Sequence, residues 1–518
     1  MKKVYCLAIL LMFSLALVAC TEGTAEDSDA TSDTQGEGGK NKDNIVIGFE
    51  SDAATLIANS DVNYVTDAQI RSIYDPLIDR DGNTGEFVPV LAEEWDNIDE
   101  LTWRLKLREG VKFHNGSDFN AEAAKFSIDY ILDDANQSFY KSRWIDVQEV
   151  KVLSDYEVEI ITSKPFPSLI ERIADDLLIM DPIYVNEVGT EEASKKPVGT
   201  GPYEFVEWSR DNFLKLKAFE DYWAGPAEIK NVEFRYIPEF STRLSAFVSG
   251  EIDMFKNVPV DSVEKIESDE NSKIAETASS RINYLALSTF ADGPMKDVKV
   301  RQAMNHAIDV NELLEAVLNG HGTRLIGPLS KINSGYVETE AYEYDPEKAK
   351  ELLKEAGYDP ESLELTLDTP NGRYPMDSQI AQAIAAQLQR IGITVNVQVN
   401  EWGAHLEKVR NREIKDMFIL GWGPAFDAQS TIENLFTEAG PYSSFSEPEL
   451  EKKIYETNAM FDQDERFDGY AEIQKSLVEQ AAWVPLWQQS DMYAVRENLN
   501  FNPKVDEKIL PYEMSWEN

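Results

Sequence analysis

Alternating apolar and polar residues predict β-strands in the first half of the chain. Residues 45–49 form a short apolar run, and in 101–107 every second residue is apolar while the others are polar or basic. A period of two is typical of a strand that buries one face. Asn115-Gly116 predicts a turn, and the apolar spacing at about 120–132 predicts a helix. The first half is therefore expected to be rich in sheet.

Strand and helix patterns alternate in the second half. The apolar positions predict a strand at 363–367, a helix at about 376–391, a strand at 393–399, a helix at 402–411 and a strand at 417–420. Two overlapping strand–helix–strand units are typical of a parallel sheet, because each helix lets the next strand run in the same direction. The sequence therefore predicts an α/β fold.

Two loops follow the strands of this predicted sheet and carry the candidate binding residues. Ligands of open parallel sheets sit outside the carboxyl ends of the strands, where these loops lie. One loop carries a cation and the other an anion, which suits a zwitterion such as a short peptide, with Asp427 on the ammonium and Arg373 on the carboxylate. The candidates are Arg373, Tyr374, Trp422, Gly423, Phe426 and Asp427.

Four of the candidates also have a purely structural interpretation. Asp427 precedes the helix expected near Ala428, and aspartate is a common helix cap. Arg373 can be a solvated loop residue. Trp422 and Phe426 can pack under the sheet edge, and packing is the favoured role for one of these two aromatic residues. From the pattern alone, the cap is the favoured role of Asp427.

The start of the chain has the pattern of a secreted lipoprotein. Lys2 and Lys3 precede an apolar run that ends Leu17-Val18-Ala19-Cys20, which predicts a signal peptide at 1–19. This ending resembles the lipobox of bacterial lipoproteins and implies that Cys20 is lipidated. Residues 20–44 have no large apolar side chain, so they are expected to form an acidic tether. Cys6 is the only other cysteine, which excludes a disulfide framework.

Length, charge and missing motifs narrow the function. A chain of 518 residues is expected to form several domains. Its net charge of −45 disfavours nucleic acid as a partner. We find no GxSxG, GxxxxGK, GxGxxG or HExxH motif, so no catalytic residue, metal or cofactor is expected. His114 is expected on a strand, and His306, His321 and His405 on or beside helices. A lipid-anchored hydrolase with an unrecognised carboxylate pair remains the alternative of another class.

The chain resembles the oligopeptide-, dipeptide- and nickel-binding proteins (family 5) of bacterial ABC importers along its whole mature body. The matching segments are RSIYDPLIDRDG (71–82), LAEEWDNIDELTWRLKLREGVKFHNG (91–116), KKPVGTGPYEFVEW (195–208), FEDYWAG (219–225), SGEID (249–253), DVKVRQAMNHAID (297–309) and YDPEKAKELLKEAGY (344–358). The resemblance implies a two-lobed periplasmic-binding-protein-like fold with an extra subdomain on the first lobe. The implied bounds are 45–85, 197–288 and 489–518 for lobe I, 86–196 for the subdomain and 289–488 for lobe II.

The resemblance also implies a function and ligand roles. GRYPMD places Arg373 where dipeptide-binding members hold the peptide carboxylate, and GWGPAFD places Asp427 where they hold the amine. WGPAFD is also similar to a stretch of nickel-binding members, although Phe426 stands at a position that is tyrosine there. A short peptide is the implied ligand, with a nickel chelate or glutathione as alternatives.

The implied role is that of a receptor, not an enzyme. It would stand on the outer face of the cytoplasmic membrane, anchored through Cys20, and deliver its ligand to an ABC importer permease. A monomer is expected.

Overall fold

Lobe I is built from segments near both ends of the described chain. A computed structural model describes residues 42–60 and 64–517, so the predicted signal peptide, Cys20 and most of the tether lie outside the described residues. The elements of lobe I are β1 (Asn44–Phe49), α1 (Tyr64–Ile73), β2 (Ile78–Arg80), β8 (Tyr203–Ser209), β9 (Phe213–Ala218), β10 (Asn231–Tyr236), α7 (Phe240–Ser249), β11 (Met254–Lys256), α8 (Val263–Glu267), β18 (Leu499–Asn500) and β19 (Ser515–Trp516). The short strand β3 (Phe87–Pro89) pairs with β2 and leads into the subdomain.

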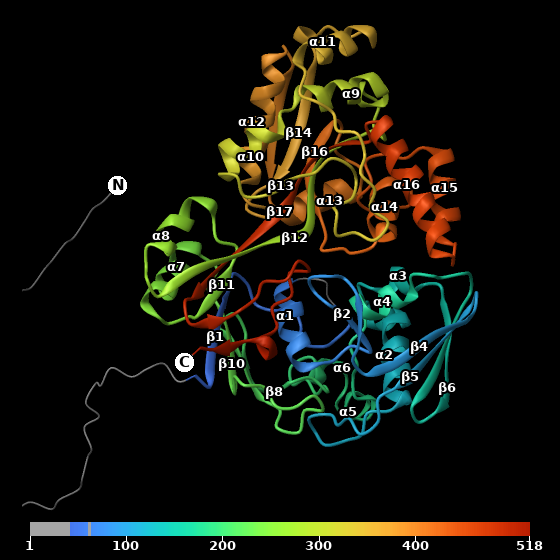
Figure 1. Cartoon of the computed structure of the whole chain (residues 1–518), viewed down its shortest axis with the longest axis vertical. Helices are drawn as coiled ribbons and strands as arrows, with labels where there is room; N and C mark the ends of the chain where they lie inside the picture. The colour runs from blue at the N-terminus through green and yellow to red at the C-terminus, as the bar shows by residue number, and fades with distance from the viewer. Residues whose placement is uncertain (1–41, 61–63, 518) are drawn as a thin grey trace, which may run out of the picture. The chain divides into compact units, whose positions relative to one another are not determined.

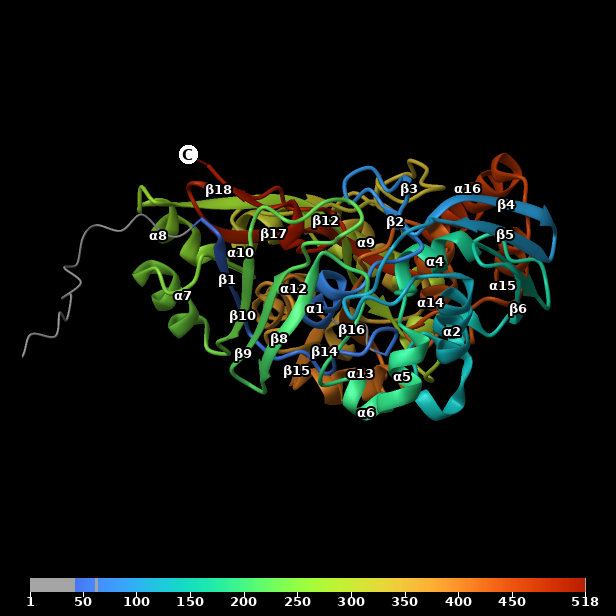
Figure 2. The same ribbon diagram turned by 90° about the horizontal axis from the view of Figure 1, so that it is seen from below.

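A second, antiparallel sheet forms a subdomain next to lobe I. Its elements are β4 (Ala92–Asp99), β5 (Thr102–Leu107), α2 (Ala121–Leu132), α3 (Lys141–Trp144), β6 (Val147–Ser154), β7 (Glu157–Thr162), α4 (Leu169–Asp176), α5 (Pro182–Val188) and α6 (Thr190–Ala193). The strand order is β4-β5-β7-β6. The inward side chains of the alternating strands, such as Leu105 and Val158, join Ile128 of α2 and Ile173 of α4 in one core. Figures 1 and 2 show this subdomain and the α7–α8 pair at opposite ends of lobe I.

Lobe II contains the predicted strand–helix–strand units. Its elements are α9 (Val298–Ala307), α10 (Val310–Leu318), β13 (Thr323–Arg324), α11 (Pro346–Glu355), β14 (Glu364–Pro370), α12 (Asp377–Arg390), β15 (Thr394–Asn400), α13 (Trp402–Arg410), β16 (Met417–Trp422), α14 (Ala428–Phe436), α15 (Pro448–Asn458) and α16 (Gln463–Glu479). β14 pairs in parallel with both β15 and β16, which confirms the predicted parallel arrangement. The two faces of β16 pack into separate cores, with Met417 and Ile419 in one and Phe418 and Leu420 in the other.

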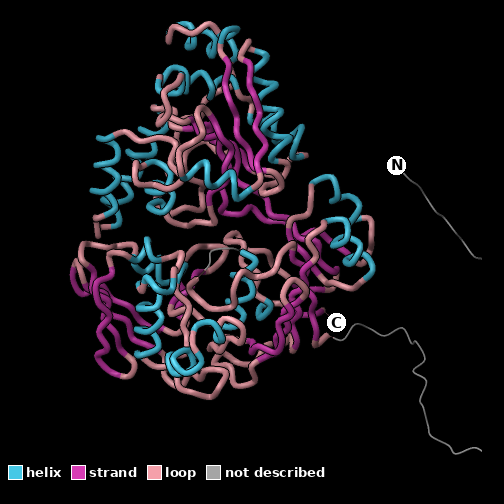
Figure 3. Tube along the Cα trace, turned by 180° about the vertical axis from the view of Figure 1, so that it is seen from behind, coloured by secondary structure: helices cyan, strands magenta, loops and turns pink. Residues whose placement is uncertain are grey.

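Two long strands connect the lobes. β12 (Ser272–Leu287) and β17 (Trp483–Arg496) pair with each other along most of their length. β17 also pairs with β11 of lobe I, and β12 with β16 of lobe II, so one sheet runs in the order β15-β14-β16-β12-β17-β11-β1-β10-β9-β8. Figure 3 shows the strands continuing from one lobe into the other.

One expectation about a histidine is wrong. His114 lies in a turn and not on a strand. The strand alternation ends with β5 at Leu107, and Gly110 follows with a φ of +77°, so the chain leaves the sheet before it reaches His114. The His114 ring lies against lobe I, with Nε2 at 2.9 Å from the carbonyl oxygen of Gly201.

Four buried charges lie where the connecting strands meet lobe I. Lys256 Nζ is 2.7 Å from Asp491 Oδ2 and 2.9 Å from Glu507 Oε2. Arg281 Nε of β12 donates to Glu507 Oε1 at 2.8 Å. Burial of charge is costly unless each charge is paired, and here two cations face two carboxylates. We call these four residues the hinge cluster.

Candidate ligand-binding site

Asp427 caps the helix that follows β16. Its Oδ1 accepts a hydrogen bond from the backbone N–H of Ser430 at 2.6 Å, and α14 begins at Ala428. The side chain is also almost fully buried, with 3% of the residue exposed. The structural role predicted from the pattern is therefore confirmed, but it uses only part of the hydrogen-bonding capacity of the carboxylate.

Arg373 is held on a loop that Asp377 organises. The Asp377 carboxylate accepts from the backbone N–H groups of Gly372 at 3.0 Å, Arg373 at 2.9 Å and Tyr374 at 3.2 Å. The Arg373 guanidinium lies 5.1 Å from the ring centroids of Tyr374 and Trp402. Stacking on two rings fixes the direction of a planar cation while its donors stay available for a ligand.

The two loops meet at one edge of the sheet. β14 and β16 are neighbouring parallel strands, so their carboxyl ends face the same way. Tyr374 donates from its hydroxyl to the carbonyl oxygen of Gly421 at 3.1 Å, which ties the arginine loop to the aspartate strand. A Cβ at Gly421 would lie 2.6 Å from Cε1 of Tyr374, so this contact requires glycine. The predicted cation and anion therefore occupy the same end of lobe II.

The other three predicted residues have different surroundings. Gly423 has a φ of +125°, and a Cβ there would lie 2.9 Å from Cα of Arg281, so the close approach to β12 excludes a side chain. Phe426 is 5% exposed. The guanidinium carbon of Arg80 lies over the Phe426 ring, 5.5 Å from the ring centroid. Trp422 is half-buried against Tyr442, and its indole N–H is buried without a partner among the described residues. Phe426 thus packs against Arg80, while Trp422 keeps an unused donor.

Charged residues of lobe I and its subdomain interact electrostatically with Asp427. Burial and then the Asp427 carboxylate raise the pKa of Glu171 to about 8. Arg80 Nη2 lies 3.6 Å from Glu171 Oε2, and Arg80 Nε donates to Asp175 Oδ1 at 2.9 Å. Burial lowers the pKa of Arg172, but the surrounding carboxylates raise it above its usual value, and Asp427 has the largest effect among them. Asp427 therefore faces a mixed set of charges from the other lobe.

Sequence reasoning missed Arg80, Glu171 and Arg172. The only local signal is that Arg172 falls on the apolar side of α4, among Leu169, Ile170 and Ile173, all of which are buried. A charged residue on a buried helix face is unusual unless it has a partner. The Asp427 carboxylate affects the pKa of Arg172 although the two residues are far apart in the sequence, so no local pattern links them.

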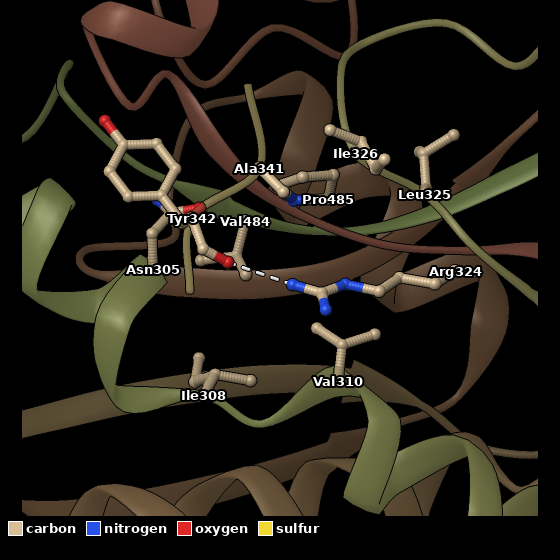
Figure 4. A pocket seen from close by; sticks show the side chains of 10 residues that line it. All are labelled: Asn305, Ile308, Val310, Arg324, Leu325, Ile326, Ala341, Tyr342, Val484 and Pro485. Atoms are coloured by element: carbon tan, nitrogen blue, oxygen red, sulfur yellow. Dashed lines mark hydrogen bonds between the residues drawn. The ribbon is translucent and has the colours of Figure 1, made fainter. Parts of the chain in front are cut away.

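Two cavities lie away from the predicted residues. One, inside lobe II, has a volume of about 10 Å³, and at its wall Arg324 Nη2 donates to the carbonyl oxygen of Tyr342 at 2.9 Å (Figure 4). It has room for about one water molecule. The other, of about 220 Å³, lies in lobe I beside Asp75, whose pKa burial raises to about 7.

The described residues contain neither a cluster of metal ligands nor a membrane-spanning helix. In residues 42–60 and 64–517, no three His, Cys, Asp or Glu side chains are grouped so that they could hold a metal ion. Over the same residues, no helix has the length and apolar character needed to cross a membrane. His405, on α13, is fully buried, and its Nε2 lies 3.0 Å from the carbonyl oxygen of Ile419.

Two known proteins are similar to this chain in sequence over most of their length. The chain is 29% identical over 430 residues to the glutathione-binding protein GsiB of Pectobacterium atrosepticum, covering 80% of this chain and 82% of that protein. It is 27% identical over 511 residues to heme-binding protein A of Haemophilus influenzae, covering 91% and 92% of the two chains.

A solved structure matches over most of the chain. The periplasmic binding protein DppA of Helicobacter pylori, in complex with the peptide STSA, superposes with a TM-score of 0.79 at 27% identity, over 92% of this chain and 98% of that one. The predicted two-lobed α/β fold is confirmed by this match. Residues 86–443 match the sequence profile described as bacterial extracellular solute-binding proteins, family 5 Middle. The chain therefore belongs to family 5 of the bacterial extracellular solute-binding proteins.

Proposed function

We propose that this protein captures a short peptide between its two lobes and delivers it to the permease of an ABC importer. As a member of a family of binding proteins, the chain is not an enzyme, and the hydrolase alternative has no support. The bound peptide would contact Arg373 and Tyr374 on one loop and Trp422, Gly423, Phe426 and Asp427 on the other. We also propose the lobe and subdomain bounds given by the sequence.

The observation that carries the proposal is the pair of opposite charges at one sheet edge. Arg373 and Asp427 follow neighbouring parallel strands, and Tyr374 links their loops. A peptide with free ends is a zwitterion, so it offers one ammonium to Asp427 and one carboxylate to Arg373. Closure of the lobes would remove water from these ion pairs and strengthen them. The peptide bound to DppA of H. pylori, a protein of the same fold, supports this ligand class.

Replacing Arg373 tests the carboxylate contact. Arg373 is partly exposed, so solvent weakens its ion pair. We expect Arg373→Gln to lower the affinity for free di- and tripeptides about tenfold, which is the loss of about 1.4 kcal/mol, and to leave the affinity for C-amidated peptides unchanged. Calorimetric titration measures both.

Arg390→Gln is the matched control for this variant. Arg390 is half-exposed on α12, and its Nη2 lies 2.6 Å from Oε1 of Glu312. Arg390→Gln therefore removes one positive charge from lobe II, as Arg373→Gln does, but outside the two candidate binding loops. If Arg373→Gln binds free peptides as tightly as the Arg390→Gln control does, Arg373 does not hold the ligand carboxylate.

The lipid anchor is a separate part of the proposal. The sequence Leu17-Val18-Ala19-Cys20 supports lipidation of Cys20, and the acidic residues up to Asn44 would hold the body off the membrane surface. The receptor would act there as a monomer, with no nucleic acid or cofactor involved.

Replacing Cys20 tests the anchor. We expect Cys20→Ser to move the protein from the membrane fraction to the medium or periplasm, because the lipid on Cys20 is the proposed anchor and no helix in residues 42–60 and 64–517 could span a membrane. Peptide affinity and thermal unfolding should stay at the wild-type level. Fractionation followed by immunoblotting checks this, and a variant that stays with the membrane would rule out an anchor at Cys20.

A further inference from the structure

The larger of the two cavities lies in lobe I, outside the two candidate binding loops. Its volume is about 220 Å³. An apolar cavity of about 150 Å³ can hold benzene, so this one has room for a small organic molecule. Rings from well-separated parts of the chain form much of its wall: Pro76, Pro202, Tyr222, Trp223, Pro511 and Tyr512.

Three aromatic side chains lie next to one another in this wall. The ring centroids of Tyr222 and Tyr512 are 5.2 Å apart, and those of Tyr222 and Trp223 are 5.6 Å apart. Trp223 already holds one cation, because the guanidinium carbon of Arg108 lies 4.3 Å from its ring centroid. The face of an aromatic ring carries partial negative charge, so a wall of this kind favours a positively charged occupant.

Asp75 adds a buried carboxylate to the same wall. Only 5% of the residue is exposed. Its Oδ1 accepts a hydrogen bond from the Tyr222 hydroxyl and its Oδ2 from the indole N–H of Trp223, each at 3.0 Å. Both donors are neutral, and within residues 42–60 and 64–517 no Lys, Arg or His side chain forms an ion pair with this carboxylate. Burial raises its pKa to about 7, and a cation beside it would favour the ionised form.

The other charged residues of the wall already have partners. The ion pairs are Arg71 with Asp67 at 2.8 Å, Asp79 with Lys508 at 2.7 Å and Glu513 with Lys504 at 2.6 Å. Buried charges are normally paired, because an isolated charge is costly to remove from water. Among the described residues of the wall, Asp75 is therefore the one whose charge is left for an occupant of the cavity.

We propose that this cavity binds a small quaternary ammonium compound, with the positive charge beside Asp75 and the alkyl groups against the aromatic rings. A primary ammonium has three N–H donors, and each would need an acceptor in a wall that is mostly apolar. A quaternary ammonium needs none, and its methyl groups suit the ring faces of Tyr222 and Tyr512. This site is separate from the peptide site between the lobes and does not depend on it.

Choline and dimethylbutanol, its uncharged isostere with carbon in place of nitrogen, test the role of charge. The two molecules have nearly the same shape. We expect choline to bind the purified protein at least about tenfold more tightly than the isostere, as measured by ligand-observed NMR titration. Equal affinities would show an apolar cavity without a preference for charge, and a lack of saturable choline binding would leave no such site. Either result overturns the proposal.

Replacing Asp75 tests the carboxylate. We expect Asp75→Asn to abolish the preference for choline over its isostere, because the side chain keeps its shape and loses its charge. Asp261→Asn is the matched control, since Asp261 is an exposed residue of lobe I that does not line the cavity, and this variant should keep the preference. A preference that survives in Asp75→Asn overturns the assignment of the charge to Asp75.

Two replacements of Tyr512 test the ring and provide a test even if Asp75→Asn does not fold. The Tyr512 hydroxyl donates to the carbonyl oxygen of Ala224 at 3.2 Å, a bond that Tyr512→Phe and Tyr512→Leu both lose. Only phenylalanine keeps the ring face. We expect Tyr512→Leu to weaken choline binding about threefold to thirtyfold and Tyr512→Phe to stay within about twofold of wild type. Equal choline affinities of the two variants would contradict the role of the aromatic wall.

Discussion

Asp427→Asn should weaken the binding of free dipeptides by roughly thirtyfold to several thousandfold. The loss of one partner of a buried, hydrogen-bonded charge pair costs about 2–5 kcal/mol, and 1.4 kcal/mol corresponds to a factor of about ten. Asp427 is 3% exposed, so water cannot replace it at the ligand ammonium. N-acetylated peptides have no ammonium and should lose little affinity. Calorimetric titration of both peptide sets measures the difference.

The cap role of Asp427 makes asparagine the informative replacement. Asparagine caps helices about as well as aspartate, so Asp427→Asn keeps the bond to Ser430 N–H and removes only the charge. Asp427→Ala removes both and should also lower the free energy of unfolding by about 1 kcal/mol. If Asp427→Asn binds free dipeptides like wild type, Asp427 is a helix cap and nothing more.

Lys256→Met should lower the free energy of unfolding by about 3–5 kcal/mol. Removal of one cation from the hinge cluster leaves two buried carboxylates, Asp491 and Glu507, with Arg281 as their single counter-charge. Urea unfolding checks the value. Lys299→Met is the matched control, because Lys299 pairs with Glu355 at 3.0 Å on the surface and should contribute less than about 1 kcal/mol.

Charge balance and pH provide two further checks on the hinge cluster. Lys256→Met combined with Asp491→Asn leaves one cation and one carboxylate, so part of the lost stability should return.

Burial, and then the neighbouring Glu507, raise the pKa of Asp491. A carboxyl with a raised pKa in the folded state favours folding at low pH and loses that effect as the pH rises. The free energy of unfolding that Lys256→Met loses relative to wild type should therefore be smaller at pH 5 than at pH 8. A loss that does not change with pH would contradict this account.

The sequence predicts local structure well where one periodicity is unbroken. β14, α12 and β15 have a clear apolar period, and their parallel arrangement follows from their order along the chain. Asp427 as a cap follows from its position before an apolar helix. These features depend on residues that are close in sequence.

The surroundings of the candidate site depend on contacts that no local pattern contains. Arg80 lies over Phe426, although the two residues are far apart along the chain. Against the lowering effect of burial, the Asp427 carboxylate raises the pKa of Arg172, although the two residues are far apart along the chain. Tyr374 reaches Gly421 only because the sheet places their loops together. Residues that meet in this way can be found from one sequence only when a charge interrupts an apolar helix face, as Arg172 does in α4.

The identity of the natural ligand is the most direct test of the central claim. The protein can be purified from its own cells without added peptide and then denatured, and the released small molecules can be identified by mass spectrometry while bound metal is measured by elemental analysis. We expect short peptides with a free N-terminus and a free C-terminus, and no stoichiometric nickel. Stoichiometric nickel with a small chelator, or a released ligand that is not a peptide, would contradict the proposal that Asp427 and Arg373 hold the two ends of a peptide.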